Sequence, residues 1–369
     1  MSNKKIVHYN MDEIDKIGAN YNLIWGERSN GKSYQVKHKK GVLKYLKTGR
    51  RFILMRRWKE EITSEKIESY FNDVNVSEIT DGKYNCITMY RKVLYLANYD
   101  ISTGSTKRGE KIGYVVALST EQNYAGASYL DVEDIIFEEF MSRGEYLPRS
   151  ESSKLLNFYC TVDRKRGTTR LWMVGNTISR VCPYINDWDL QHIISTQKQG
   201  TIVTKEMEGT DGEKILLAIE YCKSTGVSSH TFGNHAKMLN DGSWQTDPQP
   251  HLPKSINEYK CLMRIVFQFK GFKFIGKLLN DGKTQPWFIF PYRGEIDDKT
   301  IVISDEIRPS KLWQRDIYHP TINNSVLQKY LNTFRESNIF YATDLCGTDF
   351  KQAIDFIILK WPAPEYLLN

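Results

Sequence analysis

Eight residues near the start of the chain have the types and spacing needed to hold a phosphate group. An apolar run at 22–25 leads into the pattern G-x-x-x-x-G-K-S, here Gly26-Glu27-Arg28-Ser29-Asn30-Gly31-Lys32-Ser33. Gly26 and Gly31 allow backbone angles that turn successive N–H groups around an anion. Lys32 would reach the β- and γ-phosphates, and the Ser33 hydroxyl would take one site on Mg²⁺. The pattern predicts a nucleotide site; a chance Gly-rich turn is the alternative.

A second stretch ends an apolar strand with two carboxylates, in the sequence Asp134-Ile135-Ile136-Phe137-Glu138-Glu139-Phe140. A phosphate-loop enzyme needs one acid here for the Mg²⁺ shell and a second to polarise the attacking water. We assign Glu138 to the metal and Glu139 to the general base. Aspartate is usual at the first position, but glutamate is also a hard oxygen ligand. Without the phosphate loop before it, this pattern would indicate only a strand end that meets solvent.

Polar residues also surround the strand predicted at 170–174. Asn176 follows that strand, where an amide could sense the γ-phosphate; an ordinary turn residue is the alternative. Arg164 and Arg166 precede the strand. An arginine there cannot easily reach its own nucleotide but could complete a neighbour's site in trans. A basic surface turn is the other interpretation of these two residues.

These groups meet only if the chain folds as an α/β sheet whose strands end at one edge. We predict strands at 22–25, 51–56, 114–118, 134–140 and 170–174, and helices at 32–47, 60–71 and 150–161. Open α/β sheets bind ligands outside the carboxyl ends of their strands. The helix after the loop would also direct its N-terminal dipole at the phosphates.

Residues 73–112 look like an insertion. The alternating runs 85–90 and 92–98 predict a hairpin. The small, polar and basic stretch 102–111, with Lys107, Arg108 and Lys111, predicts an exposed mobile loop. It could contact a phosphate backbone, or it could be a solvated hairpin tip.

The second half of the chain predicts a smaller α/β domain. Residues 196–214 are polar and predict a linker, or a hairpin at a domain boundary. Alternating runs and a turn predict a hairpin domain, and helical patterns close the chain, with strands at 264–269, 272–277, 287–290 and 300–304 and helices at 323–335 and 350–359. The predicted domains are 1–195 and 215–369, joined by 196–214.

Composition narrows the class of protein. The 369 residues are 40% hydrophobic and 26% charged, which predicts a globular protein without a membrane span or signal peptide. The six scattered cysteines predict reduced, mostly buried thiols in the cytoplasm. The net charge of +7 lies entirely in residues 1–200, with 31 Lys/Arg against 24 Asp/Glu, whereas 201–369 hold 20 of each. This bias suits a polyanionic partner.

Together these motifs resemble the genome-packaging ATPases of small, protein-primed tailed bacteriophages, through G-E-R-S-N-G-K-S at 26–33, F-I-L-M-R-R-W-K at 52–59, D-I-I-F-E-E-F at 134–140, T-V-D-R-K-R at 161–166 and V-G-N at 174–176. The resemblance implies a P-loop NTPase domain of the additional-strand, catalytic-glutamate class. It implies a second domain like an inactive ribonuclease-H-like nuclease, and residues 262–277 indeed contain no Asp or Glu.

The resemblance also implies a function. Members hydrolyse ATP with Mg²⁺ to drive double-stranded DNA into a preformed procapsid. They form a homo-oligomeric ring, a pentamer in the type resembled, on the portal vertex, with help from a packaging RNA. Such a protein would work in the host cytoplasm, attach transiently to the procapsid and be absent from the mature virion.

Residue roles follow from matching positions. Arg28 would contact phosphate or a neighbour, and Arg164 would be the trans arginine finger. Arg56 and Lys59 match a basic pair implicated in subunit or DNA contact. Lys107, Arg108, Lys111 and Arg166 are further candidates for such contacts, although the longer insertion at 73–112 makes the DNA-gripping loop the least transferable element.

Two other functions use the same motifs. A nucleotide or small-molecule kinase would need an arginine-bearing lid and a substrate pocket, which the neutral, hairpin-rich second half does not suggest. A non-motor DNA-binding accessory protein would retain only a vestigial nucleotide site.

Overall fold

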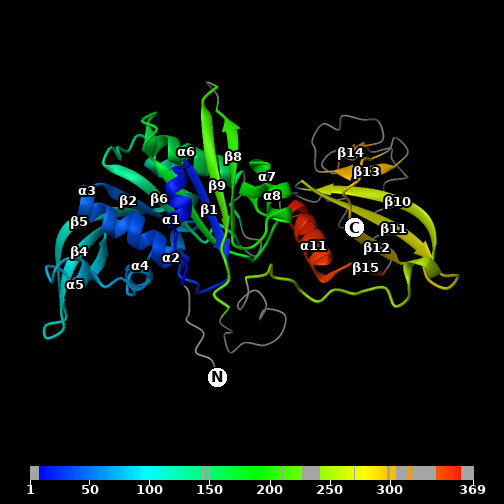
Figure 1. Ribbon diagram of the computed structural model, residues 1–369, viewed down its shortest axis with the longest axis horizontal. Helices are drawn as coiled ribbons and strands as arrows, with labels where there is room; N and C mark the ends of the chain where they lie inside the picture. The colour runs from blue at the N-terminus through cyan, green and yellow to red at the C-terminus, as the bar shows by residue number, and fades with distance from the viewer. Residues whose placement is uncertain are drawn as a thin grey trace. The chain divides into compact units, whose positions relative to one another are not determined.

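The computed structural model describes residues 8–142, 146–147, 150–209, 212–226, 242–269, 271–296, 300–304, 314–316 and 338–358. The chain divides into two compact units, each built on one sheet (Figure 1). The first unit comprises Met1–Ile178, Thr196–Thr231 and Ala236–Ser243, and the second comprises Ser179–Ser195, Phe232–His235 and Trp244–Asn369.

The sheet of the first unit has nine strands in the order β3-β4-β5-β2-β6-β7-β1-β9-β8. Their bounds are β1 Tyr21–Gly26, β2 Arg51–Arg56, β3 Cys86–Tyr90, β4 Val93–Asp100, β5 Ser105–Ala117, β6 Val132–Glu138, β7 Arg170–Asn176, β8 Thr201–Glu208 and β9 Lys214–Tyr221. The six strands from β5 to β9 in this order are parallel to one another. Strand β7 lies between the loop strand β1 and the acid strand β6, as the additional-strand class requires, so this part of the predicted fold class is confirmed.

Helices cover this sheet because its central strands are apolar on both faces. All six residues of β1 are buried, as are the middle four of β2. The helices are α1 Asp12–Ile17, α2 Lys32–Val36, the π-helical η1 Lys37–Leu43, α3 Lys44–Thr48, α4 Ser64–Tyr70, α5 Val76–Ile79 and α6 Glu151–Asp163, with 3₁₀ turns η2 Lys59–Glu61 and η3 Leu118–Tyr124.

The helix predicted at 32–47 is confirmed, running from α2 through η1 to α3. It ends at Gly49, whose φ of 71° is left-handed. The single helix predicted at 60–71 is instead a 3₁₀ turn followed by α4. The break occurs because the Thr63 side chain accepts a hydrogen bond from the Lys66 N–H (3.3 Å) and so starts a new helix.

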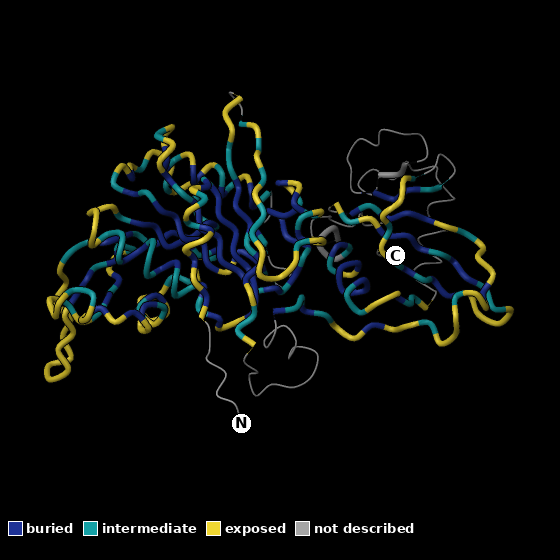
Figure 2. The backbone as a smooth tube through the Cα atoms, viewed as in Figure 1, coloured by how far each residue is buried: buried dark blue, intermediate teal, exposed yellow. Residues whose placement is uncertain are grey.

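The insertion forms the β3–β4 hairpin that the alternation predicts, but the next stretch differs from the prediction. Residues from Ser105 onward belong to β5 and pair with β4 up to Asp100, so only a short turn joins the two strands. The far end of this hairpin is exposed on every side (Figure 2). Because both faces of the pair meet solvent there, no apolar alternation marks the strand. The structure thus contains a hairpin here, and contact with a phosphate backbone stays a prediction.

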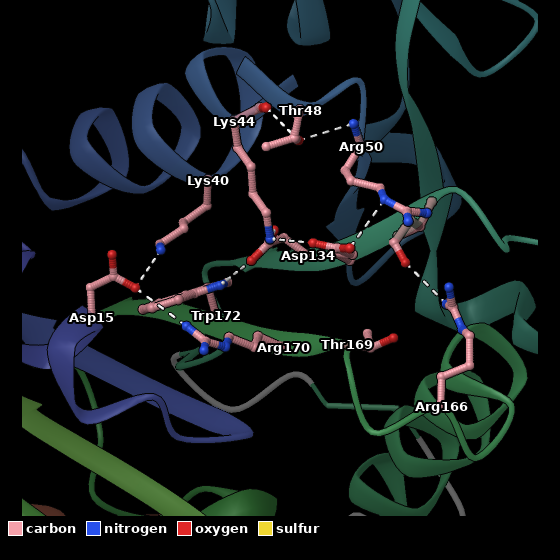
Figure 3. Close-up of polar contacts among 12 residues, drawn as sticks. Asp15, Lys40, Lys44, Thr48, Arg50, Asp134, Arg166, Thr169, Arg170 and Trp172 are labelled. Carbon is pink, nitrogen blue, oxygen red and sulfur yellow. Dashed lines mark hydrogen bonds and ion pairs between the residues drawn. The ribbon is translucent and has the colours of Figure 1, made fainter. Parts of the chain in front are cut away.

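At the amino ends of the parallel strands, an ionic network surrounds the buried Asp134 (Figure 3). Asp134 is almost fully buried on β6 and accepts from Lys44 Nζ (2.5 Å) and from Trp172 Nε1 (2.8 Å). Lys44 also pairs with Glu133 (3.0 Å), and Lys40 from the same helix pairs with Asp15 of α1. These contacts tie the helix that follows the phosphate loop to strands β6 and β7.

For residues 196–214 the sequence predicts a linker or a hairpin, and the structure contains the hairpin. Strands β8 and β9 pair antiparallel, and β9 adds to β1 in parallel, so residues 201–221 extend the first sheet. Ala218, Ile219 and Tyr221 are buried there. A domain beginning at residue 215 is therefore not what the structure contains. Its second unit instead takes α7 Pro183–Asp187 and most of α8 Gln191–Thr196, then resumes at Trp244.

The sheet of the second unit has six strands in the order β14-β13-β10-β11-β12-β15. The elements are β10 Lys260–Phe269, β11 Phe272–Asn280, β12 Trp287–Pro291, β13 Ile301–Ser304, β14 Gln314–Asp316, β15 Ile339–Tyr341, α11 Asp344–Ile358 and the 3₁₀ turn η4 Ile256–Glu258. Strands β10 to β12 are antiparallel, while β13 and β14 continue parallel to β10. This is the strand arrangement of a ribonuclease-H-like sheet, as the resemblance implies.

Aromatic side chains form the core of this second sheet. Phe350 of α11 packs its ring edge-on against Phe267 and Phe274, with centroids 5.3 and 5.2 Å away. This helix corresponds to the one predicted at 350–359, but it begins six residues earlier than expected, at Asp344. The helix predicted at 323–335 lies outside the described residues.

No helix in the described ranges is long and apolar enough to cross a membrane. The six cysteines carry free thiols, of which Cys182, Cys222 and Cys346 are buried.

Candidate nucleotide site

The phosphate loop connects β1 to α2 with two left-handed residues. Ser29 has φ 62°, and Gly31, which caps α2, has φ 96°. A Cβ at Gly31 would meet its nearest atom, His8 Cβ, at an ordinary 3.8 Å, so the backbone angle is what demands glycine there. Gly26 is required for space, because a Cβ there would lie 2.9 Å from Cys222 Cβ, directly after β9. Arg28 is exposed.

Lys32 is buried at the centre of the site, with 4% of its surface exposed. Its Nζ donates to the Glu27 carbonyl (2.6 Å) and to Asn176 Oδ1 (2.8 Å), so Asn176 reaches the loop from β7 as predicted. No carboxylate of a described residue lies within ion-pair distance of Nζ. Burial lowers the pKa of Lys32. An incoming anion would supply the missing countercharge.

Ser33 and Glu138 meet beside this lysine. Ser33 Oγ donates to Glu138 Oε2 (2.9 Å), across 105 residues of sequence. Glu138 Oε1 accepts from the Tyr70 hydroxyl (2.6 Å), a contact that sequence reasoning missed. Burial raises the pKa of Glu138, and the hydrogen bonds from Tyr70 and Ser33 offset only part of that rise. The two predicted metal-side oxygens are therefore adjacent, with Tyr70 orienting one of them.

Glu139 lies one residue beyond β6 and has a different environment. Its φ of 57° is left-handed, and its side chain is 54% exposed. Its Oε2 accepts from Arg56 Nη2 (2.9 Å), and Arg56 Nε also lies 3.4 Å from a Glu61 oxygen. Arg56, which the resemblance suggests for subunit or DNA contact, is thus held by two carboxylates of its own chain at the edge of this site.

Two more residues at this edge were missed by the sequence analysis. The buried Glu27 accepts from Ser224 Oγ (2.7 Å) and from the Thr225 N–H (2.7 Å), which fastens the chain after β9 to the loop. The buried Arg57 donates to Glu151 and to the carbonyls of residues 139 and 140. A charged residue directly before or after an apolar strand is the only sequence signal for either.

The structure does not bring Arg164 or Arg166 to this site. Both lie at the end of α6, which starts near Glu139 and extends about 20 Å away from it. Arg164 is exposed and donates to the Ala127 carbonyl (2.8 Å). Arg166 donates to several backbone carbonyls of its own chain, those of Tyr129, Leu130, Val132, Val162 and Asp163. Its guanidinium is thus committed to holding the start of β6 (Figure 3).

The remaining basic candidates lie on other elements. Lys107 and Arg108 are exposed on β5, where the Arg108 guanidinium stacks over the Tyr90 ring (4.0 Å). Lys111 lies over the Tyr114 ring (4.1 Å), and Lys59 is exposed in η2. These residues form no part of the phosphate site.

Comparison with known proteins agrees with this geometry. The family model described as podovirus DNA encapsidation protein (Gp16) matches residues 3–205, more than half of the chain. The chain belongs to this family. The match spans the phosphate loop, both acids, Asn176 and α6.

Curated relatives match about half of the chain. The DNA packaging protein of Bacillus phage phi29 is 31% identical over 183 residues, which are 49% of each chain. The DNA packaging protein of Bacillus phage B103 is 32% identical over 171 residues, 44% of this chain and 46% of the relative. The chain thus spans about half the length of the curated relatives it matches.

One solved structure extends the likeness to both units. A chain in the bacteriophage Phi-29 viral genome packaging motor assembly matches with a TM-score of 0.57 over 95% of this chain and 99% of that one, at 21% identity. The likeness shows a shared fold across the encapsidation-family chain, including the region after residue 205 that the family model does not match.

Proposed function

We propose that this chain is the ATP-hydrolysing subunit of a homo-oligomeric ring that drives double-stranded viral DNA into a preformed procapsid. The observation that carries the proposal is the convergence of Lys32, Ser33, Glu138 and Asn176 at one edge of the sheet, next to Glu139. Membership in a DNA encapsidation family supports the choice of DNA as the cargo.

The roles of the residues follow from their contacts. Loop N–H groups and the Lys32 ammonium bind the triphosphate, because Nζ is bonded only to neutral oxygens among the described residues. Asn176 orients that ammonium toward the terminal phosphate. Glu139, outside the bonded cluster, accepts a proton from the attacking water. Arg56 orients the Glu139 carboxylate through its 2.9 Å contact.

The donor set also fits Mg²⁺. Ser33 and Glu138 present adjacent hard oxygens, and Tyr70 orients the carboxylate. When bound, the ion would neutralise charge on the phosphate oxygens. Burial raises the pKa of Glu138, and a bound cation would favour its carboxylate form.

The position of Arg164 supports a finger that acts in trans. The helix α6 separates it by about 20 Å from Glu151, which lies beside the acids of its own site, and Arg164 is exposed. A ring would bring this surface to a neighbouring subunit's nucleotide. The solved motor assembly of similar fold supports an oligomer; the pentamer, the portal vertex and a packaging RNA are adopted from the family resemblance.

DNA contact is assigned to the β4–β5 hairpin. Lys107 and Arg108 are exposed along it, and Tyr90 offers a partly exposed ring. Cations on an exposed hairpin suit a phosphate backbone. The second unit serves as a docking domain without nuclease activity, because β10 and β11 carry no acid. Such a protein acts in the host cytoplasm, attaches transiently to the procapsid and is absent from the mature virion.

The deciding experiment measures Mg·ATP turnover by the full chain with and without double-stranded DNA. The motor predicts turnover stimulated by DNA and abolished in Lys32→Ala. Phosphate transfer to a small acceptor would instead indicate a kinase. Nucleotide binding with no turnover under any assembly condition would indicate an accessory protein, and would overturn the proposal.

A further inference from the structure

The buried pair Arg57–Glu151 lies behind the proposed general base. Arg57 directly follows β2, is 4% exposed and packs beside the rings of Phe137 and Tyr146. Its Nε lies 3.0 and 3.1 Å from the two oxygens of Glu151, whose side chain is fully buried. A pair placed so far from solvent has a large desolvation penalty and so calls for a specific role.

The other nitrogens of Arg57 bind the backbone at the base itself. Nη1 donates to the Glu139 carbonyl (3.1 Å), and Nη2 donates to the Phe140 carbonyl (2.7 Å). Glu139 is the residue with φ 57°, a conformation that is unfavourable by about 1–2 kcal/mol for a residue with a Cβ. The two bonds from Arg57 fix the two consecutive carbonyls that follow the Glu139 Cα, so they stabilise the conformation that directs the Glu139 side chain.

Glu151 completes the arrangement from the opposite side. It is the first residue of α6, where a negative charge is favoured, and its Oε2 also accepts from the Leu147 N–H (2.6 Å). The pair therefore joins three segments: the end of β2, the turn after β6 and the start of α6. Within the first unit, Arg56 binds the Glu139 carboxylate and Arg57 binds its backbone.

We infer that Arg57 is a positioning residue for hydrolysis, which sets the direction of the Glu139 carboxylate by holding the two carbonyls that follow the Glu139 Cα, with Glu151 fixing the guanidinium. This inference rests on the proposed function. Lysine cannot replace arginine here, because a single ammonium lacks the planar fork that spans two carbonyls and a carboxylate. Displacement of a reacting group by 1 Å can lower a rate by about 100-fold.

The first test compares Arg57→Lys and Glu151→Gln with Asp134→Asn in the full chain. Asp134 is the matched control, because it is an equally buried partner of an ion pair in the same sheet. We expect Arg57→Lys to lower kcat about 100-fold with KM for ATP unchanged, and Glu151→Gln to lower it less. Asp134→Asn should lower Tm and leave kcat unchanged. A purely structural role for Arg57 would give the same pattern in all three variants.

The second test uses non-additivity. In a Glu139→Gln background the direction of this side chain no longer matters, so adding Arg57→Lys should lower kcat no further. Independent losses that multiply would overturn the inference. If wild-type protein fails to turn over Mg·ATP at all, the proposed function fails first. If it turns over ATP and Arg57→Lys matches its kcat, only the positioning role is refuted.

Discussion

Lys32 and Lys44 belong to one helical run and lie near opposite ends of the parallel strands, the carboxyl edge and the amino edge of the nine-stranded sheet. Their surroundings differ. At the carboxyl edge, Lys32 is buried against a carbonyl and an amide oxygen, both neutral. At the amino edge, Lys44 is paired with two carboxylates, those of Glu133 and Asp134. Burial lowers the pKa of Lys32. At Lys44, burial acts in the same direction, but Asp134 and Glu133 outweigh it and raise the pKa.

The difference separates a ligand site from a structural one. The partly buried Lys44 ammonium, with two carboxylates in place, needs no further countercharge from solution. A buried ammonium with only neutral partners retains attraction for an anion, which suits a triphosphate. The same contrast holds for acids: Asp134 is satisfied by Lys44 and Trp172, whereas Glu139 is half-exposed, and among the described residues its carboxylate is held by Arg56.

The largest expected effect concerns Arg164, which the structure separates from its own site. Arg164→Ala should retain nucleotide binding and lower turnover by about 10³–10⁵, the range for an arginine finger. Lys165→Ala is the matched control, since it removes a charge from the same left-handed turn. Mixing Arg164→Ala with Lys32→Ala subunits should partly restore turnover. No recovery in the mixture would mean that Arg164 does not act on a neighbour.

The next effect compares the two adjacent acids at the carboxyl edge. Glu139→Gln should lower turnover by about 10³ and leave bound ATP trapped, because a general base contributes 10²–10⁴. Glu138→Gln should instead weaken the dependence on Mg²⁺. The two variants are compared by single-turnover assay across a Mg²⁺ titration. Identical responses would show that the division of roles between the adjacent acids is wrong.

The two lysines give the third comparison. Lys32→Ala should abolish nucleotide binding with little loss of stability, since it removes a charge that lacks a countercharge. Lys44→Ala should leave binding intact but destabilise the fold by about 3–5 kcal/mol, because it strands the buried Asp134. Nucleotide titration and urea unfolding measure the two effects. If both variants bind nucleotide equally, the contrast between the edges has no functional meaning.

The smallest effect concerns Glu220, a carboxyl of β9 that accepts from the Tyr9 hydroxyl (2.6 Å). Burial raises the pKa of Glu220 to about 7. Because the folded state holds the Glu220 proton more tightly than the unfolded state, the protonated carboxyl contributes stability that is fully present below pH 4.5. This stability is lost as the pH rises through about 7. The loss amounts to about 3 kcal/mol at most. Glu220→Gln should flatten the stability profile between pH 5 and 8, as followed by urea unfolding; an unchanged profile would exclude Glu220 as its source.

The sequence predicted the parts of the site that rest on local patterns. The phosphate loop, its helix and the two acids after β6 are each encoded within a few residues, and so is the amide after β7. The contacts of Tyr70, Glu27 and Arg57 were not predictable, because their partners lie 68, 197 and 94 residues away. Only the strand order brings such pairs together.

Elements of the fold, too, were predictable where a local sequence pattern marked them. Buried strands stood out as apolar runs, whereas the outer part of β5 and the strand β8 are exposed or alternate too weakly to be distinguished from loops. The hairpin β8–β9 was therefore mistaken for a linker. Its place in the sheet depends on pairing between β9 and β1, which composition does not reveal.

Strand β7 also acts as a spacer. Neighbouring strands lie about 4.8 Å apart, so one interposed strand separates β1 from β6 by roughly 10 Å. Were the two adjacent, both carboxylates would crowd the loop lysine and neutralise it. The interposed strand instead keeps the carboxylates of the described residues outside ion-pair distance of the Lys32 ammonium.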